Sequence, residues 1–572
     1  MNTLVVAAIR CSLMFLVPAV AYAGSAQWDL NPTSGDWNTA ANWTPNGIPN
    51  GPADIATFGL SHTTDLSISA DTEVNGIIFT SAATNPYTIT ASPGLTLTIS
   101  GVGITNNSGV TQNFVTAVEG TGSRGQIIFR NSASAGSSGI FTNKASAAQF
   151  VVGGQTAFYN TSTAANGTFV NQGGSFSGSY GGRTTFHDSS SAGNGNFTNR
   201  GGTAFNTGSG STDFLDSSTA ANGTFINEGS AANFADGGSA IFVDSSTAAN
   251  GTFINNGATI SGGFGGFTLF EDNSTAGNGI FINNGGAAGG VFALGGGNTI
   301  FLKTSTAGNG TFINNPATAS GAEGGVTEFG IFPSAHNDSP SAGNGTFINN
   351  GATVSGAAGG KTVFYETSTA DAATLIANGG TNGGLGGTVF FEEKSTGGTA
   401  RVEVFGNGSL DISNHFLSPL GVTVGSIEGD GNAFLGSNNL KVGSNDLSTT
   451  FSGVIQGMGG SLTKIGTGTL DLTGANTYTG NTNVNRGVLQ VNGSITSNTF
   501  VRGGGMLAGT GTVYGNLVNN NGGKGEPRAR ARPPRRANRR PQLHAGAICP
   551  SHDPDCRCER WSIQCSECSR DC

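Results

Sequence analysis

A phenylalanine that returns every 28 residues constrains the fold of this chain more than any other feature. Each copy lies in a near-repeat of Ser-Thr-Ala-Ala-Asn-Gly-Thr-Phe-Ile-Asn, and a second phenylalanine follows 17 residues later with the same period. The first series is Phe141, Phe169, Phe197, Phe225, Phe253 and Phe281, and the second is Phe158, Phe186, Phe214, Phe242 and Phe270. Self-similarity at a period of this length predicts a solenoid, in which each unit buries its apolar face only against its neighbours. Because a repeat multiplies a stacking surface and not a catalytic site, the pattern also argues against an enzyme.

The composition fits a thin and regular core. The 572 residues include 96 glycines and 36 phenylalanines, and only 10% are charged, whereas soluble domains carry about 25% charged residues and about 7% glycine. Ser, Thr, Asn and Gly, which favour turns, take the place of charge. We expect many small aromatic layers instead of one large globular core.

Residues 1–23 have the layout of a secretory signal peptide. Arg10 supplies a positive charge, residues 11–20 form an apolar run, and Ala21-Tyr22-Ala23 is a small-x-small site that predicts cleavage between Ala23 and Gly24. The apolar run is too short to span a bilayer, so we expect an exported protein. Residues 24–520 contain no cysteine, and stability must come from stacking and not from disulfides.

Residues 24–128 read as an N-terminal cap followed by the first coils. Trp28, Trp37 and Trp43 are gathered there, and large aromatics at one end suit a cap that closes a solenoid. Stacking on carbohydrate is the alternative role for these rings. Short alternating runs from residue 76 to 130 predict strands of about five residues.

Residues 129–415 hold the 28-residue coils. Asn-Gly before the first-series phenylalanines from Phe169 to Phe281 signals either a hairpin or a corner between parallel strands. We favour parallel coils, because the register holds over many units, with Gly and Asn adopting the left-handed conformation of the corner. Neighbouring coils then lie about 4.8 Å apart. The steps from Phe281 to Phe312 and from Phe312 to Phe347 are 31 and 35 residues, and such insertions form loops on one face, often the binding face.

A polar series lies two positions after the second phenylalanine. Stacked carboxylates about 4.8 Å apart repel one another unless they are hydrated or neutralised, and calcium is one neutraliser. Turn residues that bond to backbone N–H groups are the simpler interpretation, which we favour. The series is Asn131, Asn160, Asp188, Asp216, Asp244, Asp272 and Lys303, with Glu366 and Glu393 in later coils.

Residues 416–522 carry a recognisable repeat. The segment 462–491, which begins Leu-Thr-Lys-Ile-Gly-Thr-Gly-Thr-Leu-Asp-Leu-Thr-Gly-Ala-Asn-Thr-Tyr, resembles the autotransporter-associated β-strand repeat, also called the passenger-associated transport repeat. The resemblance implies an all-β, right-handed parallel β-helix (a β-solenoid) that is exported by type V secretion, with this repeat assisting export and folding. Leu462, Leu470 and Leu472 are expected inside the strand layers, and Lys464 and Asp471 outside.

Residues 523–572 differ in kind from the rest. Ten of the chain's arginines and six of its seven cysteines lie there, where the resemblance implies a C-terminal outer-membrane barrel. Synonymous codons for Lys524 to Pro533, read in another frame, give Val-Ser-Pro-Gly, which suits the family; we therefore hypothesise a frameshifted, disordered tail, which resequencing of the locus tests. The alternatives are a metal or nucleic-acid site. Cys556-x-Cys558 and Cys565-x-x-Cys568 match no standard zinc spacing.

The six histidines, at positions 62, 187, 336, 415, 544 and 552, form no spaced catalytic set. We predict a secreted or cell-surface passenger that serves adhesion, aggregation or display, with no catalytic residue, no bound metal or cofactor and no nucleic-acid partner, calcium being the weaker alternative. Expected partners are a surface ligand, either a glycan or a protein, and an outer-membrane barrel or assembly machinery for export. A polysaccharide-acting β-helix lyase or hydrolase is the runner-up.

Overall fold

The computed structural model describes residues 24–120, 122–288, 295–331, 338–416 and 421–520, and the backbone of 524–525 and 530–531. The predicted signal peptide, with Ala23, and most of the predicted tail, with all of its cysteines, therefore lie outside the described residues. The described residues belong to one compact unit. The described residues contain strands and one short 3-10 helix, η1 (Ala40–Asn42). None of their helices is long and apolar enough to cross a membrane.

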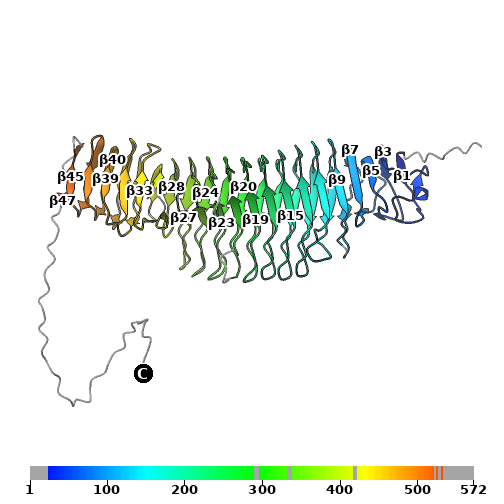
Figure 1. The fold of residues 1–572 in the computed structure, drawn as a ribbon, viewed down its shortest axis with the longest axis horizontal. Coiled ribbons are helices and arrows are strands. Elements are labelled where there is room, and N and C mark those ends of the chain that lie inside the picture. Colours follow the sequence, from blue (N-terminus) through cyan, green and yellow to red (C-terminus); the bar gives the residue numbers. More distant parts are fainter. Residues whose placement is uncertain are drawn as a thin grey trace, which may run out of the picture. The chain divides into compact units, whose positions relative to one another are not determined.

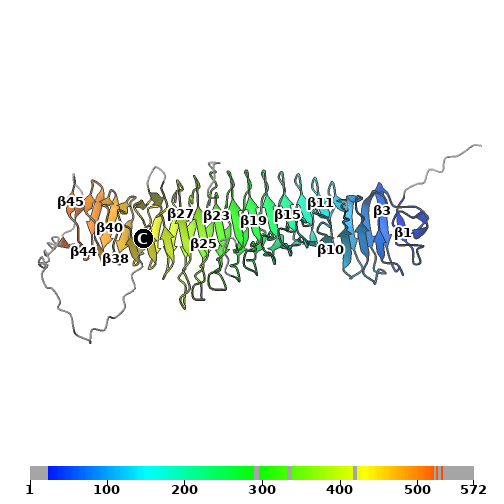
Figure 2. The ribbon, with the colours of Figure 1, turned by 60° about the horizontal axis from the view of Figure 1, so that its bottom comes forward.

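The strands stack on the faces of successive coils, as Figures 1 and 2 show. Two faces run along the described solenoid, and we call them face A and face B. Face A consists of β1 (Ala26–Trp28), β2 (Trp43–Thr44), β3 (Gly51–Phe58), β5 (Thr72–Phe79), β7 (Thr96–Asn106), β9 (Gln126–Phe129), β11 (Gln155–Phe158), β13 (Arg183–Phe186), β15 (Ser211–Phe214), β17 (Ser239–Phe242), β19 (Phe267–Phe270), β21 (Asn298–Phe301), β23 (Val326–Phe329), β25 (Lys361–Phe364), β27 (Thr388–Phe391), β29 (Ser409–Asp411), β32 (Asn432–Phe434) and β35 (Val454–Gln456).

Face B lies across the core from face A. It consists of β4 (Asp65–Ser67), β6 (Thr88–Ala91), β8 (Gln112–Thr116), β10 (Ser137–Asn143), β12 (Asn166–Asn171), β14 (Asn196–Asn199), β16 (Thr224–Asn227), β18 (Thr252–Asn255), β20 (Ile280–Asn283), β22 (Thr311–Asn314), β24 (Thr346–Asn349), β26 (Thr374–Ala377), β28 (Arg401–Val404), β31 (Ser426–Gly429), β34 (Thr449–Phe451), β37 (Thr469–Leu472), β40 (Gly487–Val491), β43 (Gly505–Ala508) and β46 (Lys524–Gly525).

Two further sheets complete the C-terminal coils. One consists of β30 (Val422–Val424), β33 (Asn439–Val442), β36 (Ser461–Lys464), β39 (Thr482–Val484), β42 (Thr499–Val501) and β45 (Leu517–Asn519). The other consists of β38 (Ala475–Asn476), β41 (Ser494–Ile495), β44 (Thr512–Val513) and β47 (Arg530–Ala531). In the 28-residue coils the third side is a column of single bridges, such as Thr219 to Thr247.

The strands pair in parallel, coil upon coil. Phe225 lies opposite Phe253 and Asn227 opposite Asn255, and each named strand pairing in the described residues is parallel except that of β1 with β2. The predicted parallel β-solenoid is therefore confirmed, and the hairpin alternative is wrong.

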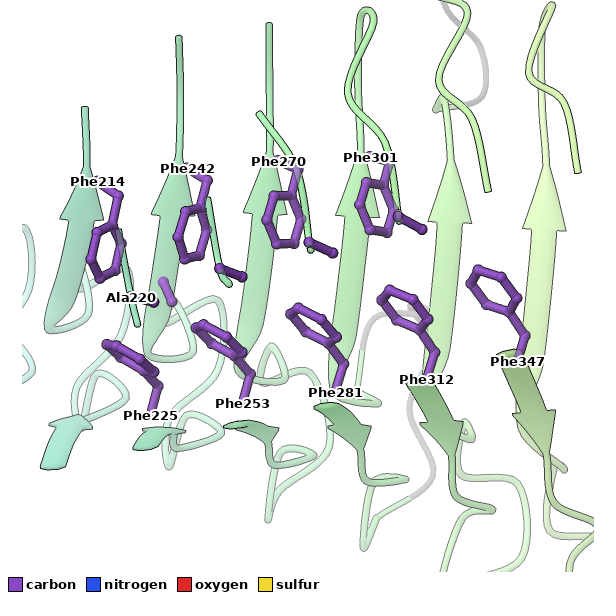
Figure 3. Close-up of a cluster of buried hydrophobic side chains, with 14 of the residues drawn as sticks. Phe214, Ala220, Phe225, Phe242, Phe253, Phe270, Phe281, Phe301, Phe312 and Phe347 are labelled. Atoms are coloured by element: carbon purple, nitrogen blue, oxygen red, sulfur yellow. The ribbon is translucent and has the colours of Figure 1, made fainter. Parts of the chain in front are cut away.

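Two phenylalanine stacks fill the core (Figure 3). Phe225 and Phe253 are stacked with ring centroids 4.6 Å apart, and Phe242 meets Phe253 edge-on at 5.6 Å. Both arrangements are favoured by the ring quadrupole. The two predicted phenylalanine series thus form one continuous apolar seam.

The glycine of Asn-Gly has a different role from the one predicted. A Cβ on Gly223 would lie 2.9 Å from the ring of Phe225, so glycine is required for close packing of the ring. The left-handed residue is the one before the asparagine, such as Ala221 with φ of 49°. In other coils a glycine holds that place, such as Gly193 with φ of 61°. The predicted left-handed corner is therefore wrong for the Asn-Gly pair itself and right for the glycine that precedes the pair in those coils.

A column of buried asparagines runs beside the rings. The side-chain amide of Asn227 donates to Asn255 Oδ1 at 2.7 Å, and that of Asn255 donates to Asn283 at 2.8 Å. A threonine on face A completes the other units, as Thr268 Oγ1 donates to Asn255 Oδ1 at 3.0 Å, whereas Ala240 holds that position beside Asn227. The inner asparagine ladder comprises Asn143, Asn171, Asn199, Asn227, Asn255, Asn283, Asn314 and Asn349.

The tryptophans close the N-terminal end from within. Trp28, Trp37 and Trp43 are all fully buried, and Trp43 lies 5.0 Å from both other rings and 5.6 Å from Phe58. These rings are not accessible to a ligand, so their alternative role in carbohydrate stacking is wrong.

The C-terminal coils are shorter than the predicted period. Leu470 pairs with Leu489 and Leu489 with Leu507, which are 19 and 18 residues apart. Lys464 is 1% exposed, and its ammonium donates to the backbone carbonyls of residues 465 and 466; the prediction that it lies outside is wrong. The strand register puts it opposite Val442.

The solenoid also passes the predicted boundary at residue 522. Lys524 pairs with Met506 and Arg530 with Thr512, so β46 and β47 continue the stack. The prediction that disorder begins at 523 is wrong for these two short strands.

Candidate binding surface

A row of stacked loops projects from the solenoid between face B and face A (Figure 1). Each loop joins a face B strand to the next face A strand, as residues 228–238 join β16 to β17. The loop tips bond to one another: Phe150 N–H donates to Gly178 O at 2.8 Å, and Phe234 N–H donates to Gly262 O at 2.8 Å. The loop row thus extends the stack of coils into an ordered surface. It comprises the described residues of 144–154, 172–182, 200–210, 228–238, 256–266, 284–297, 315–325, 350–360 and 378–387.

The two predicted insertions lie at different places. The first, between Phe281 and Phe312, lengthens the loop row, since β20 ends at Asn283 and β21 begins at Asn298. The second follows β23, on the other side of face A; its His336 lies outside the described residues, and Asp338 is buried.

Three aromatic side chains are exposed at the loop tips. Phe150 is 73%, Phe205 58% and Phe234 44% exposed. Phe205 and Phe234 contact each other edge-on at 5.7 Å. They fall outside the two 28-residue series, so the repeat pattern of the sequence does not reveal them.

A small slot of about 260 Å³ opens where the loop row meets face A. Its apolar lining includes Phe264, Phe267 and Ile300, and Asp236 and Asn298 supply the polar groups. Burial raises the pKa of Asp236, and Asn298 Oδ1 is buried without a hydrogen-bond partner within the described structure.

A polar cluster lies on the outside of face A, on β13 and β15, two to three coils before the slot. Thr185 Oγ1 lies 3.2 Å from His187 Nε2 and accepts from Gln155 at 3.0 Å. Burial raises the pKa of Asp213, and the positive charge of Arg183 opposes this rise. Burial also lowers the pKa of His187. The cluster brings together a hydroxyl, an imidazole, a guanidinium and a carboxyl group, which the sequence alone did not place side by side.

A second titratable group lies further along face A. Glu328 has Ile300 and Val363 as its strand neighbours. Burial raises its pKa to about 7, and the nearby Lys361 opposes the rise. Lys361 itself pairs with Glu323 of the loop row at 2.8 Å.

The C-terminal coils carry two open grooves. The larger, of about 580 Å³, is lined by Arg401, Glu403, Glu428, Asp471 and Gln490 among others. Arg401 pairs with Glu403 at 3.3 Å and also with Glu428. Asp471 accepts hydrogen bonds from Gln490 and Asn492, which confirms its predicted outward position. The second groove, of about 500 Å³, lies beside Phe434 and Met458.

The polar series of the turns forms hydrogen bonds between coils. The backbone N–H of Asp188 donates to Asp216 Oδ2 at 2.9 Å, and that of Asp216 donates to Asp244 Oδ2 at 3.0 Å. Asp216 has φ of 57°, a conformation that Asn and Asp tolerate better than most residues. The turn interpretation therefore accounts for these contacts, although the N–H belongs to the neighbouring coil and not to the same turn. A role for calcium stays a prediction; the described residues hold no cluster of three or more potential metal-ligating side chains.

The histidines in the described residues are dispersed. His62 contacts Asn31 in the cap, His187 stacks on Tyr159 with centroids 4.5 Å apart, and His415 is buried against Ser395 O. Of these three, His187 belongs to the face A cluster.

Comparison with known proteins identifies the C-terminal repeat. The model of the passenger-associated transport repeat matches residues 462–491. An extracellular serine protease of Serratia marcescens is 52% identical over 64 residues, or 11% of this chain and 6% of that protein. The BmaC autotransporter adhesin of Brucella suis biovar 1 is 42% identical over 96 residues, or 16% of this chain and 3% of the adhesin.

The chain is of the autotransporter-passenger type. The transport repeat of this passenger runs from β36 to β40, and its Leu462, Leu470 and Leu472 are buried, as predicted. The relatives agree with a secreted or cell-surface location. The passenger spans only 3–6% of the length of the curated relatives it matches. A crystallised hyper-glycosylated TibA fragment aligns with 77% of the passenger and 93% of the fragment at 15% identity, with a TM-score of 0.19, too low to bear on the fold.

Proposed function

We propose that this passenger is a cell-surface adhesin that binds its target through the loop row. The observation that carries the proposal is the position of the loops: they are stacked on a rigid solenoid whose C-terminal coils include a transport repeat. Loops positioned by a rigid scaffold are where binding residues concentrate. The name of the BmaC relative, an adhesin, supports the same assignment.

The electrostatics favour binding over catalysis at these loops. Tips such as 203–206 and 231–234 contain no charged residue, and general acid or base chemistry requires a titratable group. In the proposed adhesin, the loops form the contact surface for the target and the solenoid is the extended scaffold that carries them.

The test is retention of coated beads on a surface. Beads carrying the purified chain should bind to cultured epithelial cells or to extracellular matrix, and soluble chain should compete. A variant with Ser-Gly tips in place of the exposed aromatic residues should bind less, whereas N250A, on the other edge of face B, should bind like the parent. Retention equal to that of bare beads would contradict adhesion.

The face A cluster supports a second candidate, cleavage of an acidic polysaccharide. Arg183 can neutralise a carboxylate, and His187, whose Nε2 lies 3.2 Å from Thr185 Oγ1, can take up a proton. Lyase activity on alginate or pectate would produce an unsaturated product with ultraviolet absorbance, lost in R183A and in H187A. Failure of the chain to yield this product, or its persistence in both variants, removes the candidate.

A further inference from the structure

The loop tips carry a pairing that the fold does not require. At the left-handed position of the tip, four loops have glycine (Gly178, Gly262, Gly321 and Gly356), each preceded by serine. Three loops instead combine an exposed phenylalanine with a carboxamide: Gln149-Phe150, Phe205-Asn206 and Asn233-Phe234. The Ser-Gly loops form the same tip without either side chain. Of the three carboxamides, Gln149 donates from Nε2 to Ser177 O in the next loop at 3.0 Å, and an amide has a second N–H and an acceptor oxygen for a ligand.

Phenylalanine is also strained at this position. Phe150 and Phe234 have φ of 58° and 55°, a region that a bulky residue enters only against a steric penalty. Glycine takes the same conformation in neighbouring loops without that penalty. A strained and exposed ring where glycine is sufficient indicates a role outside folding.

The chemistry of the pair selects the ligand. An exposed ring offers a flat apolar face, and the carboxamide beside it both donates and accepts hydrogen bonds. The segments 146–151, 203–207 and 230–235 contain no charged residue, so an ionic partner has nothing to pair with. A sugar ring presents an apolar C–H face and hydroxyl groups around its edge, and it matches both halves of the pair.

We propose that the tips of residues 149–150, 205–206 and 233–234 form a binding surface for a neutral polysaccharide. The proposal rests on the adhesin function above and names its ligand class. Neighbouring tips are bonded into one ladder, so several rings can engage one glycan chain at once, and the separate weak contacts add up by multivalency. The alternative occupant is a second copy of this chain, which an exposed ring alone would favour. The carboxamide beside the ring at each of the three tips favours the glycan.

The test exchanges the two rings at the left-handed position, Phe150 and Phe234, for the glycine that neighbouring loops already have there. The double variant F150G/F234G adopts the glycine of the Ser-Gly tips, so it should fold with an unchanged or higher melting temperature. Binding of the purified chain to dextran, mannan and galactan is measured by affinity electrophoresis and calorimetry, with heparin as the charged probe. V354S, in a tip of the loop row without the pair, is the matched control.

We expect at least one neutral polysaccharide to bind the parent and V354S, and to bind F150G/F234G at least about tenfold more weakly. Absence of binding to all three neutral probes, equal binding by the double variant, or binding of heparin alone overturns the proposal. The proposal is also overturned if F150G/F234G loses self-association in the ultracentrifuge but still binds the glycan. That result would show that the rings contact a second copy of this chain. Bead adhesion by the parent chain that binds none of the neutral polysaccharides contradicts the glycan surface while the adhesin function stands.

Discussion

At the scale of single residues, stability depends on polar groups that the core encloses. Each asparagine of the inner ladder donates to the next coil and accepts from the previous one. The ladder ends at Asn349, where Ala377 and Val389 take the places of the next asparagine and threonine, and Asn349 Nδ2 is buried without a partner in the described structure. Buried amides left unpaired cost about 1–3 kcal/mol each.

Substitution N255A should destabilise the chain by about 2–4 kcal/mol. It removes the buried hydrogen bonds that Asn227 Nδ2 and Thr268 Oγ1 donate to Asn255, and the one that Asn255 donates to Asn283. The matched control is N250A, which breaks exposed amide contacts to Asn222 and Asn278 and should change stability by less than about 0.5 kcal/mol. Urea unfolding followed by circular dichroism measures both. Equal losses of unfolding free energy in N255A and N250A would show that burial does not determine how much the asparagine hydrogen bonds contribute.

Glu328 should make stability depend on pH. Its pKa of about 7 in the folded chain lies above the ordinary value, so the folded state holds the proton between pH 4.5 and 7 and stability falls as pH rises through that window. In E328Q this fall should disappear, so its melting temperature should exceed that of the parent by more at pH 8 than at pH 5. Thermal unfolding at the two pH values checks this, and a difference that stays constant would contradict it.

At the scale of elements, the turns after the face A strands add hydrogen bonds between neighbouring coils to those of the strands. The face A turn repeats a left-handed residue whose carboxyl or amide group accepts an N–H of the preceding coil. Asn160 and Asp216 perform the same task, so the acceptor oxygen and the backbone conformation matter more than the charge.

A substitution series at Asp216 separates these two contributions. D216N should be within about 0.5 kcal/mol of the parent. D216A should lose about 1–2 kcal/mol, because it adds left-handed strain to the lost hydrogen bond, and D216G should lie between them since glycine relieves the strain. Denaturant titration ranks the three. Should D216G prove as damaging as D216A, strain would have no part in the effect.

At the scale of the whole solenoid, contacts reach only the adjacent coils. Phe225 contacts Phe197 and Phe253 in its own stack and Phe214 across the core. Stability is then close to a sum of nearest-neighbour terms, and a defect is felt locally.

F225A should therefore cost about 3–5 kcal/mol at its own site. Amide hydrogen exchange should show lost protection in the strands that hold Phe197 to Phe253, while the strand of Phe347 stays protected. Uniform loss of protection along all described coils would contradict the nearest-neighbour picture.

The sequence predicts what is periodic and misses what is not. The solenoid, both phenylalanine stacks and the buried leucines of 462–491 follow from regular spacing. Burial of Lys464 was missed because residue type suggested the surface, while the strand register places it opposite Val442. The exposed ring-and-carboxamide tips and the face A cluster depend on which loops and strands the coil brings together. No regular spacing in the sequence predicts them.

The close match of the coils makes them interchangeable. Deletion of residues 226–253 joins Phe225 to Ile254, which restores the Phe-Ile-Asn motif and the same partners above and below. Such a deletion should leave a folded protein shorter by one coil spacing of about 4.8 Å, whereas deletion of half that length should not fold. Length can thus vary in whole units, by loss or duplication of one module, without any new packing problem to solve.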